Sequence, residues 1–171
     1  AGQNYTPVPI DVWAQRDAVS GVEVSPDGKH LLILKMEGGN MGENVLEIYS
    51  TNDFSKPLRR LNADKMEMIS ARWVSDTHIF GTAWQVVRKR VDGPEADVRG
   101  YRAFSYNLDK NKFANADGTY NLVAPLPKEP GFIIVEESNI NSSVGGVDLF
   151  AAFRPRAYYK YNLDSGARSL I

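Results

Sequence analysis

Two histidines, His30 and His78, are the only side chains of this 171-residue chain that could serve as the base of a serine hydrolase. The matching nucleophile would need a Gly-x-Ser-x-Gly turn, which exposes a serine between a strand and a helix. The nearest string, at residues 141–146, is Asn-Ser-Ser-Val-Gly-Gly, with Asn141 in place of the first glycine and no apolar strand directly before it. We therefore interpret this string as a polar loop and predict no catalytic residue.

The same two histidines are also the natural ligands to consider for a metal. The chain has no cysteine, and the histidines fall in different repeats, so no ligand cluster supports zinc. We predict no metal and no cofactor. Structural roles for His30 and His78 are favoured.

The elements that must position these residues form a long repeat. Three tyrosines, Tyr49, Tyr106 and Tyr161, each end an apolar segment and start a polar turn, with spacings of 57 and 55 residues. A fixed period of this length indicates one supersecondary unit used repeatedly. Two apolar segments precede each tyrosine and a shorter one follows it. Four strands in each repeat predict an all-β chain, a β-propeller fragment of about three four-stranded antiparallel blades.

The first repeat shows this pattern most clearly. We expect strands at 21–24, 30–35, 45–49 and 57–61. Ser-Pro-Asp-Gly-Lys at 25–29 is a tight turn, because proline presets φ and Asp-Gly tolerates a positive φ. Proline and two arginines in the last segment suit an exposed edge strand.

The other two repeats follow the same order. The second has expected strands at 69–74, 79–87 and 99–108, with Ser-Asp-Thr-His at 75–78 as its first turn. The third has expected strands at 122–126, 132–136 and 157–163, and a fourth begins at 167. The second strands of the three repeats therefore contain Leu32, Phe80 and Ile133. We expect one contiguous domain over residues 1–171, with a lead-in at 1–20 and repeats at about 21–65, 66–118 and 119–171.

These segments resemble a known family. Residues 24–33, Val-Ser-Pro-Asp-Gly-Lys-His-Leu-Leu-Ile, are similar to the blade signature of TolB-like and WD40-like propellers. The run from Asp11 into this signature resembles the start of the propeller in prolyl oligopeptidase-family serine peptidases, which include acylaminoacyl and dipeptidyl peptidases. Arg-Trp-Val-Ser-Asp at 72–76 and Arg-Ala-Tyr-Tyr at 156–159 add to the resemblance. It implies a propeller placed before an α/β-hydrolase domain that carries the catalytic Ser, Asp and His.

Composition fits a globular β domain. Hydrophobic residues make up 43% of the chain and charged residues 24%. These values are ordinary for a globular protein that can bury a core. Its net charge of −1 provides no field to attract nucleic acid or an anionic membrane, so we expect neither as a partner. The resemblance implies an exported bacterial protein, periplasmic or secreted, and the absence of cysteine is compatible with that location.

The loops between the second and third strands carry the functional expectation. They cover residues 37–44, 88–98 and 138–155 and lengthen along the chain. Long loops on one face of a rigid scaffold are usual recognition sites. An alternative is that the charges at 88–98 compensate one another in solvent and that the aromatic pair at 150 and 153 anchors its own loop. The candidate partner- or substrate-facing residues are Arg88, Lys89, Arg90, Glu95, Asp148, Phe150, Phe153 and Arg154.

The sequence thus predicts a non-catalytic propeller region that gates substrate access and contacts its own C-terminal catalytic domain and a peptide substrate. The main alternative is a TolB-like propeller that scaffolds protein–protein contacts without enzyme activity, and a second is a carbohydrate-binding or sugar-processing propeller. Three repeats are too few to close a ring, because propellers close with about 4 to 8 blades. We therefore expect the fragment to form a homo-oligomer through its open ends, or a complex with the missing remainder of the propeller.

Overall fold

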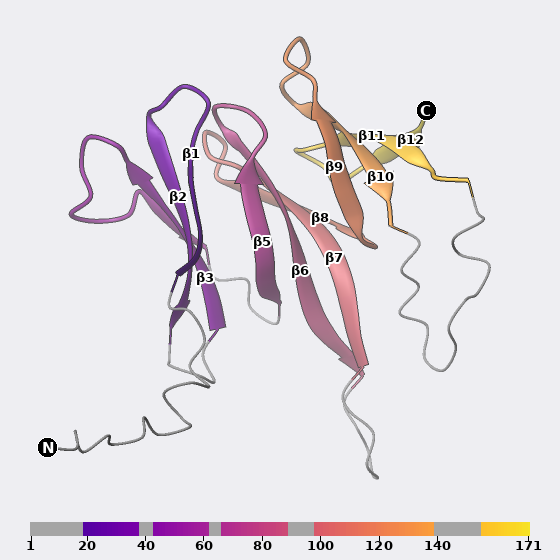
Figure 1. The fold of residues 1–171 in the computed structure, drawn as a ribbon, viewed down its shortest axis with the longest axis horizontal. Coiled ribbons are helices and arrows are strands. Elements are labelled where there is room, and N and C mark those ends of the chain that lie inside the picture. Colours follow the sequence, from indigo (N-terminus) through magenta and orange to yellow (C-terminus); the bar gives the residue numbers. More distant parts are fainter. Residues whose placement is uncertain (1–18, 38–42, 62–65, 89–97, 139–154) are drawn as a thin grey trace, which may run out of the picture.

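The computed structural model describes residues 19–37, 43–61, 66–88, 98–138 and 155–171, and every regular element in these ranges is a β-strand. Figure 1 shows the strands as three groups that follow one another along the chain. Each group is a separate four-stranded antiparallel sheet. The expected all-β class and the three meanders are confirmed.

The first sheet has the order β1-β2-β3-β4. Its strands are β1 (Val19–Val24), β2 (His30–Glu37), β3 (Glu43–Ser50) and β4 (Arg59–Leu61). Strand β1 begins inside the segment expected to be a lead-in, and the remainder of that segment lies outside the described residues. Strand β4 begins two residues after Pro57, because proline has no N–H to donate to a neighbouring strand.

The second and third sheets repeat this order. The second contains β5 (Glu67–Trp73), β6 (His78–Arg88), β7 (Val98–Asn107) and β8 (Lys112–Asp117). The third contains β9 (Tyr120–Pro125), β10 (Phe132–Glu137), β11 (Tyr158–Asn162) and β12 (Arg168–Leu170). Leu32, Phe80 and Ile133 lie in the second strand of their sheets, as the repeat predicts.

The three sheets share one register. Tyr49 pairs with Leu31, Tyr106 with Ile79 and Tyr161 with Ile133. The residue two positions after each tyrosine donates its backbone N–H to the carbonyl of the residue just before the second strand, and these bonds run from Thr51 to Lys29, from Leu108 to Thr77 and from Leu163 to Gly131. The period found in the sequence therefore marks equivalent positions in three dimensions.

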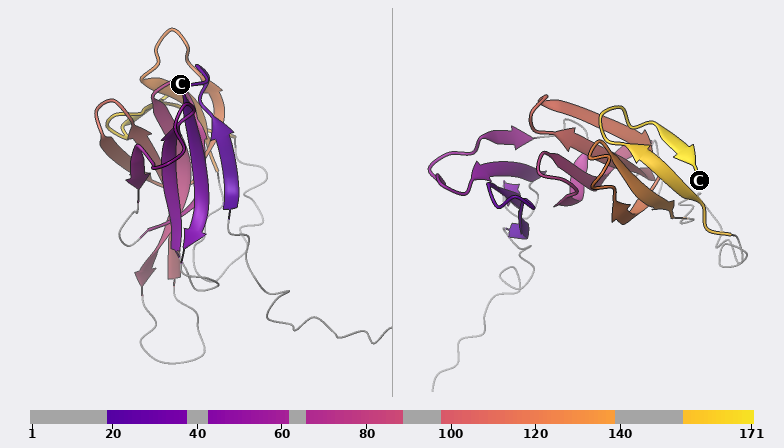
Figure 2. Two further views of the ribbon diagram at one scale, coloured as in Figure 1. Left: turned by 90° about the vertical axis from the view of Figure 1, so that its left-hand side faces the viewer. Right: turned by 90° about the horizontal axis from the view of Figure 1, so that it is seen from above.

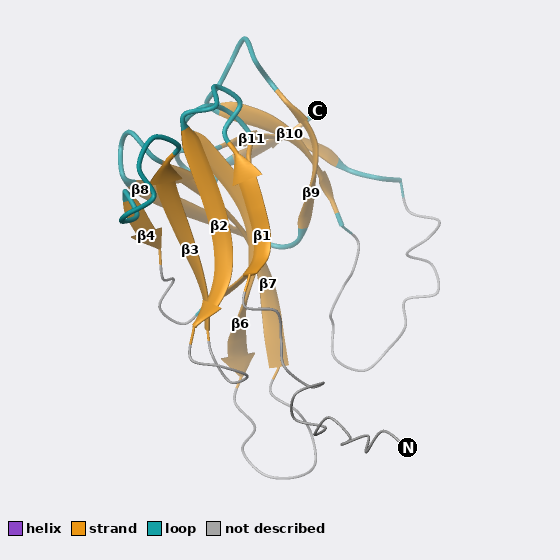
Figure 3. Cartoon of the chain, turned by 60° about the vertical axis from the view of Figure 1, so that its left-hand side comes forward, coloured by secondary structure: helices purple, strands orange, loops and turns teal. Residues whose placement is uncertain are grey.

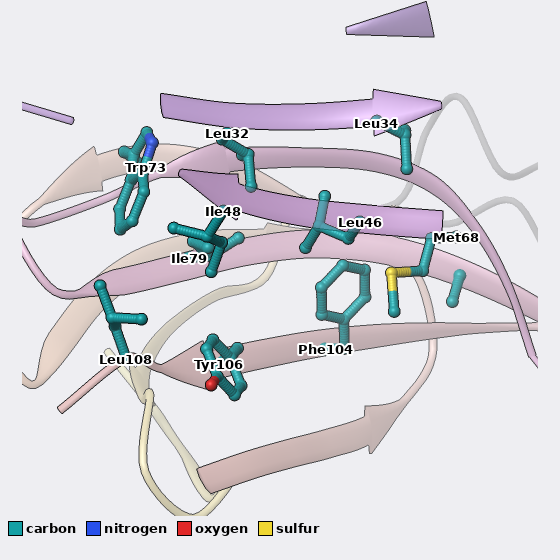
Figure 4. Close-up of a cluster of buried hydrophobic side chains, with 11 residues drawn as sticks. Leu32, Leu34, Leu46, Ile48, Met68, Trp73, Ile79, Phe104, Tyr106 and Leu108 are labelled. Atoms are coloured by element: carbon teal, nitrogen blue, oxygen red, sulfur yellow. The ribbon is translucent and has the colours of Figure 1, made fainter. Parts of the chain in front are cut away.

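Two apolar cores hold the sheets together. One lies between the first and second sheets and includes Leu34, Leu46, Met68 and Phe104 (Figure 4). The other lies between the second and third sheets and includes Phe80 and Tyr161, whose rings meet edge to face. The second sheet is thus covered on both sides, whereas the first and third stand at the two ends of the row (Figure 2).

Candidate functional site

Most of the predicted contact residues lie outside the described residues. Arg88 ends β6, and the backbone is described only to that point. Those outside are Lys89, Arg90, Glu95, Asp148, Phe150, Phe153 and Arg154. In a meander the second strand starts at the first turn and ends at the opposite end of the sheet, which is where this loop surface is expected. The contact surface stays a prediction.

The turns at the other end of the sheets are described (Figure 3). Their residues include the polar side chains of interest. In the first sheet the Ser25 hydroxyl donates to Asp27 Oδ1 at 2.6 Å and accepts the His30 N–H at 2.9 Å. Gly28 follows with a φ of 73°, a conformation that glycine adopts without strain. The Ser25 hydroxyl, then the Lys29 backbone amide, lower the pKa of Asp27. The Ser-Pro-Asp-Gly-Lys signature is therefore explained by turn formation.

The second sheet builds the same turn with different residues. Ser75 Oγ accepts the His78 N–H at 3.0 Å, as Ser25 does for His30. The His78 ring is buried, with only 7% of the residue exposed. Its Nδ1 lies 3.0 Å from Ser75 Oγ and 3.2 Å from Thr77 Oγ1. These equivalent turns place His30 and His78 at matching positions of the first and second sheets.

The other edge of the His78 ring meets two polar side chains from different sheets. Asn107 Nδ2, from the paired strand β7, lies 2.9 Å from His78 Nε2 and 2.8 Å from Asp164 Oδ1. Asp164 belongs to the β11–β12 turn of the third sheet, and its Oδ1 is 3.4 Å from His78 Nε2. We call these residues, with Lys110, the polar junction.

The hydrogen bonds of Asn107 determine the tautomer of His78. Asn107 Oδ1 accepts the Lys110 backbone N–H at 3.0 Å, so the amide nitrogen must face His78 and Asp164. Both of its protons are then used, one for each neighbour. His78 Nε2 then accepts from Asn107, which places a ring proton on Nδ1. That proton points toward the Ser75 and Thr77 hydroxyls.

Asp164 is the charged centre of the polar junction. Its carboxylate pairs with the Lys110 ammonium and accepts the Asn107 amide. The Lys110 hydrogen bond, followed by that of Asn107, lowers the pKa of Asp164 to about 2. The carboxylate is therefore ionised at neutral pH and ties the third sheet to the second.

The polar junction and the neighbouring Ser75 together provide a serine, a histidine and an aspartate, but they lack the arrangement of a hydrolase triad. A triad histidine presents an unprotonated nitrogen to the serine and its N–H to the aspartate. Here the unprotonated nitrogen of His78 faces Asn107, and Ser75 Oγ accepts backbone N–H groups of its own turn. Sequence reasoning missed this cluster, because His78 and Asp164 are 86 residues apart and meet only when two sheets pack. Its geometry serves the junction and does not activate Ser75.

The described ranges, 19–37, 43–61, 66–88, 98–138 and 155–171, lack two further features. Within those ranges no group of three or more His, Asp or Glu side chains is placed to hold a metal ion. The same ranges contain no helix of the length and apolarity that a membrane crossing requires.

Comparison with known proteins adds no relative to this description. No family model matches the chain, and neither the curated proteins nor the solved structures gave a match. Inferences about function therefore rest on the chain itself.

Proposed function

We propose that the three sheets are blades of a β-propeller and that the chain is the non-catalytic propeller region of an exported, prolyl oligopeptidase-type serine peptidase. In this role it gates access of peptide substrates and contacts the catalytic domain of the complete protein. The observation that carries the proposal is the common register of the three sheets, with the tyrosine and the following turn at the same place in each. Repeated four-stranded meanders packed face to face are the building plan of propellers.

The non-catalytic part of the proposal is supported by the polar junction. Of the two histidines, His78 directs its unprotonated nitrogen at an amide, and His30 packs on Trp73 with 5.9 Å between ring centroids. Neither presents a basic nitrogen to a serine hydroxyl among the described residues. We therefore expect the chain alone to hydrolyse neither peptides nor esters.

A fluorophosphonate probe tests the non-catalytic part directly. The purified chain should remain unlabelled, and Ser75→Ala should leave the result unchanged. Labelling that disappears in Ser75→Ala, or on mutation of any other single serine, would show that a nucleophile exists and would overturn this part of the proposal.

The peptidase assignment is tested on the complete protein. Cross-linking should place the end of the sheets opposite the described turns against a hydrolase domain. Cross-links from the turn end, at Lys110 or Lys29, to that domain would contradict the proposed arrangement. A coding sequence that continues into further blades, with no Gly-x-Ser-x-Gly segment, would favour the alternative, a TolB-like propeller for protein–protein contact.

A further inference from the structure

The two nitrogens of the buried His78 ring face different parts of the molecule. Nδ1 lies near the hydroxyls of Ser75 and Thr77, which belong to the same turn as the histidine. Nε2 lies 2.9 Å from Asn107 Nδ2 on the paired strand and 3.4 Å from Asp164 Oδ1 in the third sheet. A proton gained at Nε2 therefore acts on the contact between two sheets.

The Nδ1 edge of the ring stays the same when the ring is protonated. Because Nε2 accepts from Asn107, Nδ1 already carries a proton. An imidazolium carries a proton on both nitrogens, so Ser75 and Thr77 meet the same donor in either state. Protonation of His78 therefore changes only the Nε2 edge.

Asn107 is unable to adapt to a protonated ring by turning its amide. Its Oδ1 accepts the Lys110 backbone N–H at 3.0 Å, and a rotated amide would present its nitrogen to that N–H instead. The side chain is also buried, with 3% of the residue exposed, so a displaced donor has little access to water. With the amide fixed, a protonated Nε2 would place two donors 2.9 Å apart.

Asp164 is the acceptor that can relieve this conflict. Its Oδ1 lies only a few tenths of an ångström beyond ordinary hydrogen-bond distance from Nε2, while the Lys110 ammonium occupies the other oxygen, Oδ2. The pKa of Asp164, about 2, keeps the carboxylate ionised over the pH range in which histidines titrate. A hydrogen bond from an imidazolium to a carboxylate is also stronger than one from an amide to a neutral ring.

We propose that His78 is a proton-operated switch between the second and third sheets, in which the neutral ring accepts from Asn107 and the protonated ring donates to Asp164 Oδ1. The proton comes from solvent, and only hydrogen bonds are exchanged. The third sheet is then held through the Asn107 amide at neutral pH and directly by an ion pair at acidic pH. The inference rests on the packing of the sheets and is independent of the peptidase assignment.

The charged side chains around the ring come from several elements. The carboxylate of Asp164 faces Nε2, and the Lys110 ammonium lies behind it. The others are Asp76 on the turn of His78 itself and Asp109 on the β7–β8 turn, both exposed, and Glu129 on the β9–β10 turn, which pairs with Lys160. Asp164 is thus the anion positioned to take the new proton.

Nuclear magnetic resonance of the His30→Phe variant tests the switch. The chain has two histidines, so this background leaves His78 as the only imidazole. At about pH 8 the ring should carry its proton on Nδ1 alone, and at about pH 5 on both nitrogens. The side-chain amide resonances of Asn107 should shift with the same midpoint as the ring. Should His30→Phe fail to fold, the same titration is read in the unmodified chain, where only two imidazoles have to be assigned.

The cost of Asn107→Ala in the same background provides a second readout. At about pH 8 the substitution removes the bond to His78, whereas at about pH 5 that bond is already absent before the substitution. We expect the increase in the unfolding equilibrium constant to be about three- to tenfold larger at the higher pH. Ser50→Ala is the matched control, because Ser50 pairs with residue 30, and its effect should be equal at both pH values.

Four results would each overturn the proposal. The first is a ring at about pH 8 with its proton on Nε2, and the second is a ring that is still unprotonated at about pH 5. The third is an Asn107 amide whose resonances do not follow the ring. The fourth is an equal cost of Asn107→Ala at both pH values. Circular dichroism must show the same β-sheet spectrum throughout, and unfolding that accompanies protonation of His78 also refutes the switch.

Discussion

The two contacts between sheets differ although both start from a histidine at the same position. His78 lies between the second and third sheets and meets Asn107 and Asp164. His30 lies between the first and second sheets with its ring tilted against that of Trp73, and its buried Nδ1 has no hydrogen-bond partner among the described residues. The two contacts therefore share one backbone arrangement but differ in the side chains that meet across them.

The difference follows from two pairs of equivalent positions. Trp73 of the second sheet and Pro125 of the third occupy equivalent positions, because Trp73 pairs with Ile79 and Pro125 pairs with Ile133. The following sheet therefore provides a large aromatic ring beside His30 but none beside His78. Across the paired strand His30 faces Ser50, whereas His78 faces the longer Asn107. Trp73 is also fixed by its backbone N–H, which donates to the Glu23 carboxylate at 2.8 Å. A repeat therefore defines where sheets meet, while single side chains decide whether the contact is aromatic or ionic.

Breaking the apolar contact should have the largest effect. A Cβ on Gly81 would meet the Ser70 backbone carbonyl and the Phe104 ring, in the core between the first two sheets. We expect Gly81→Ala to reduce the free energy of unfolding by about 3 kcal/mol or more, since backbone cannot move aside as a flexible side chain can. Urea denaturation measures this. Gly131→Ala, with open space at the Cβ and no positive φ, is the control and should change stability little.

Removal of the Asn107 amide, at the centre of the polar junction, should have the second-largest effect on stability. Asn107→Ala leaves His78 Nε2, the Asp164 carboxylate and the Lys110 N–H each without one partner. We expect a loss of about 2 to 3 kcal/mol, because unsatisfied buried groups lose solvation without compensation. Ser50→Ala, at the equivalent position of the first sheet, should cost less than about 1 kcal/mol. Equal losses in the two variants would show that the junctions do not differ.

The polar junction should also make the free energy of unfolding depend on pH. The folded-state pKa of Asp164, about 2, lies below its ordinary value of 3.8. Its contribution, about 1 to 2 kcal/mol for this partly exposed group, is present above about pH 4 and is lost as the pH falls toward 2. Urea denaturation between pH 6 and pH 2 should show a smaller decrease in Asp164→Asn than in the unmodified chain. Asp76→Asn, at an exposed turn position, should retain the full decrease.

The smallest effect is expected at the aromatic contact. His30→Phe removes the unpartnered ring nitrogen and retains a ring beside Trp73. We expect stability to stay the same or to rise by up to about 1 kcal/mol, because no hydrogen bond of the side chain is lost. His78→Phe should be destabilising, since Asn107 then loses an acceptor. Thermal denaturation of the two variants compares them directly, and a large loss in His30→Phe would refute this view of the contact.

The sequence predicts the strands well, because their information is local. Alternating or continuous apolar segments end at turns such as 25–29, and the tyrosine spacing defines the register of three sheets. Ends of strands are less certain by about two residues, as at β1 and β4, since pairing partners decide them. The polar junction could not be predicted. Asp164 and Asp109 occupy equivalent turn positions, and only the packing of the sheets shows that Asp164 reaches a histidine.

One consequence concerns how such a molecule can be redesigned. At the turn end of each sheet a backbone bond, such as that from Leu108 to Thr77, ties the two turns together, so an insertion in one turn would displace both. A foreign peptide grafted at Asp109 should therefore disturb the first turn of the second sheet as well as its own turn, and so destabilise the scaffold.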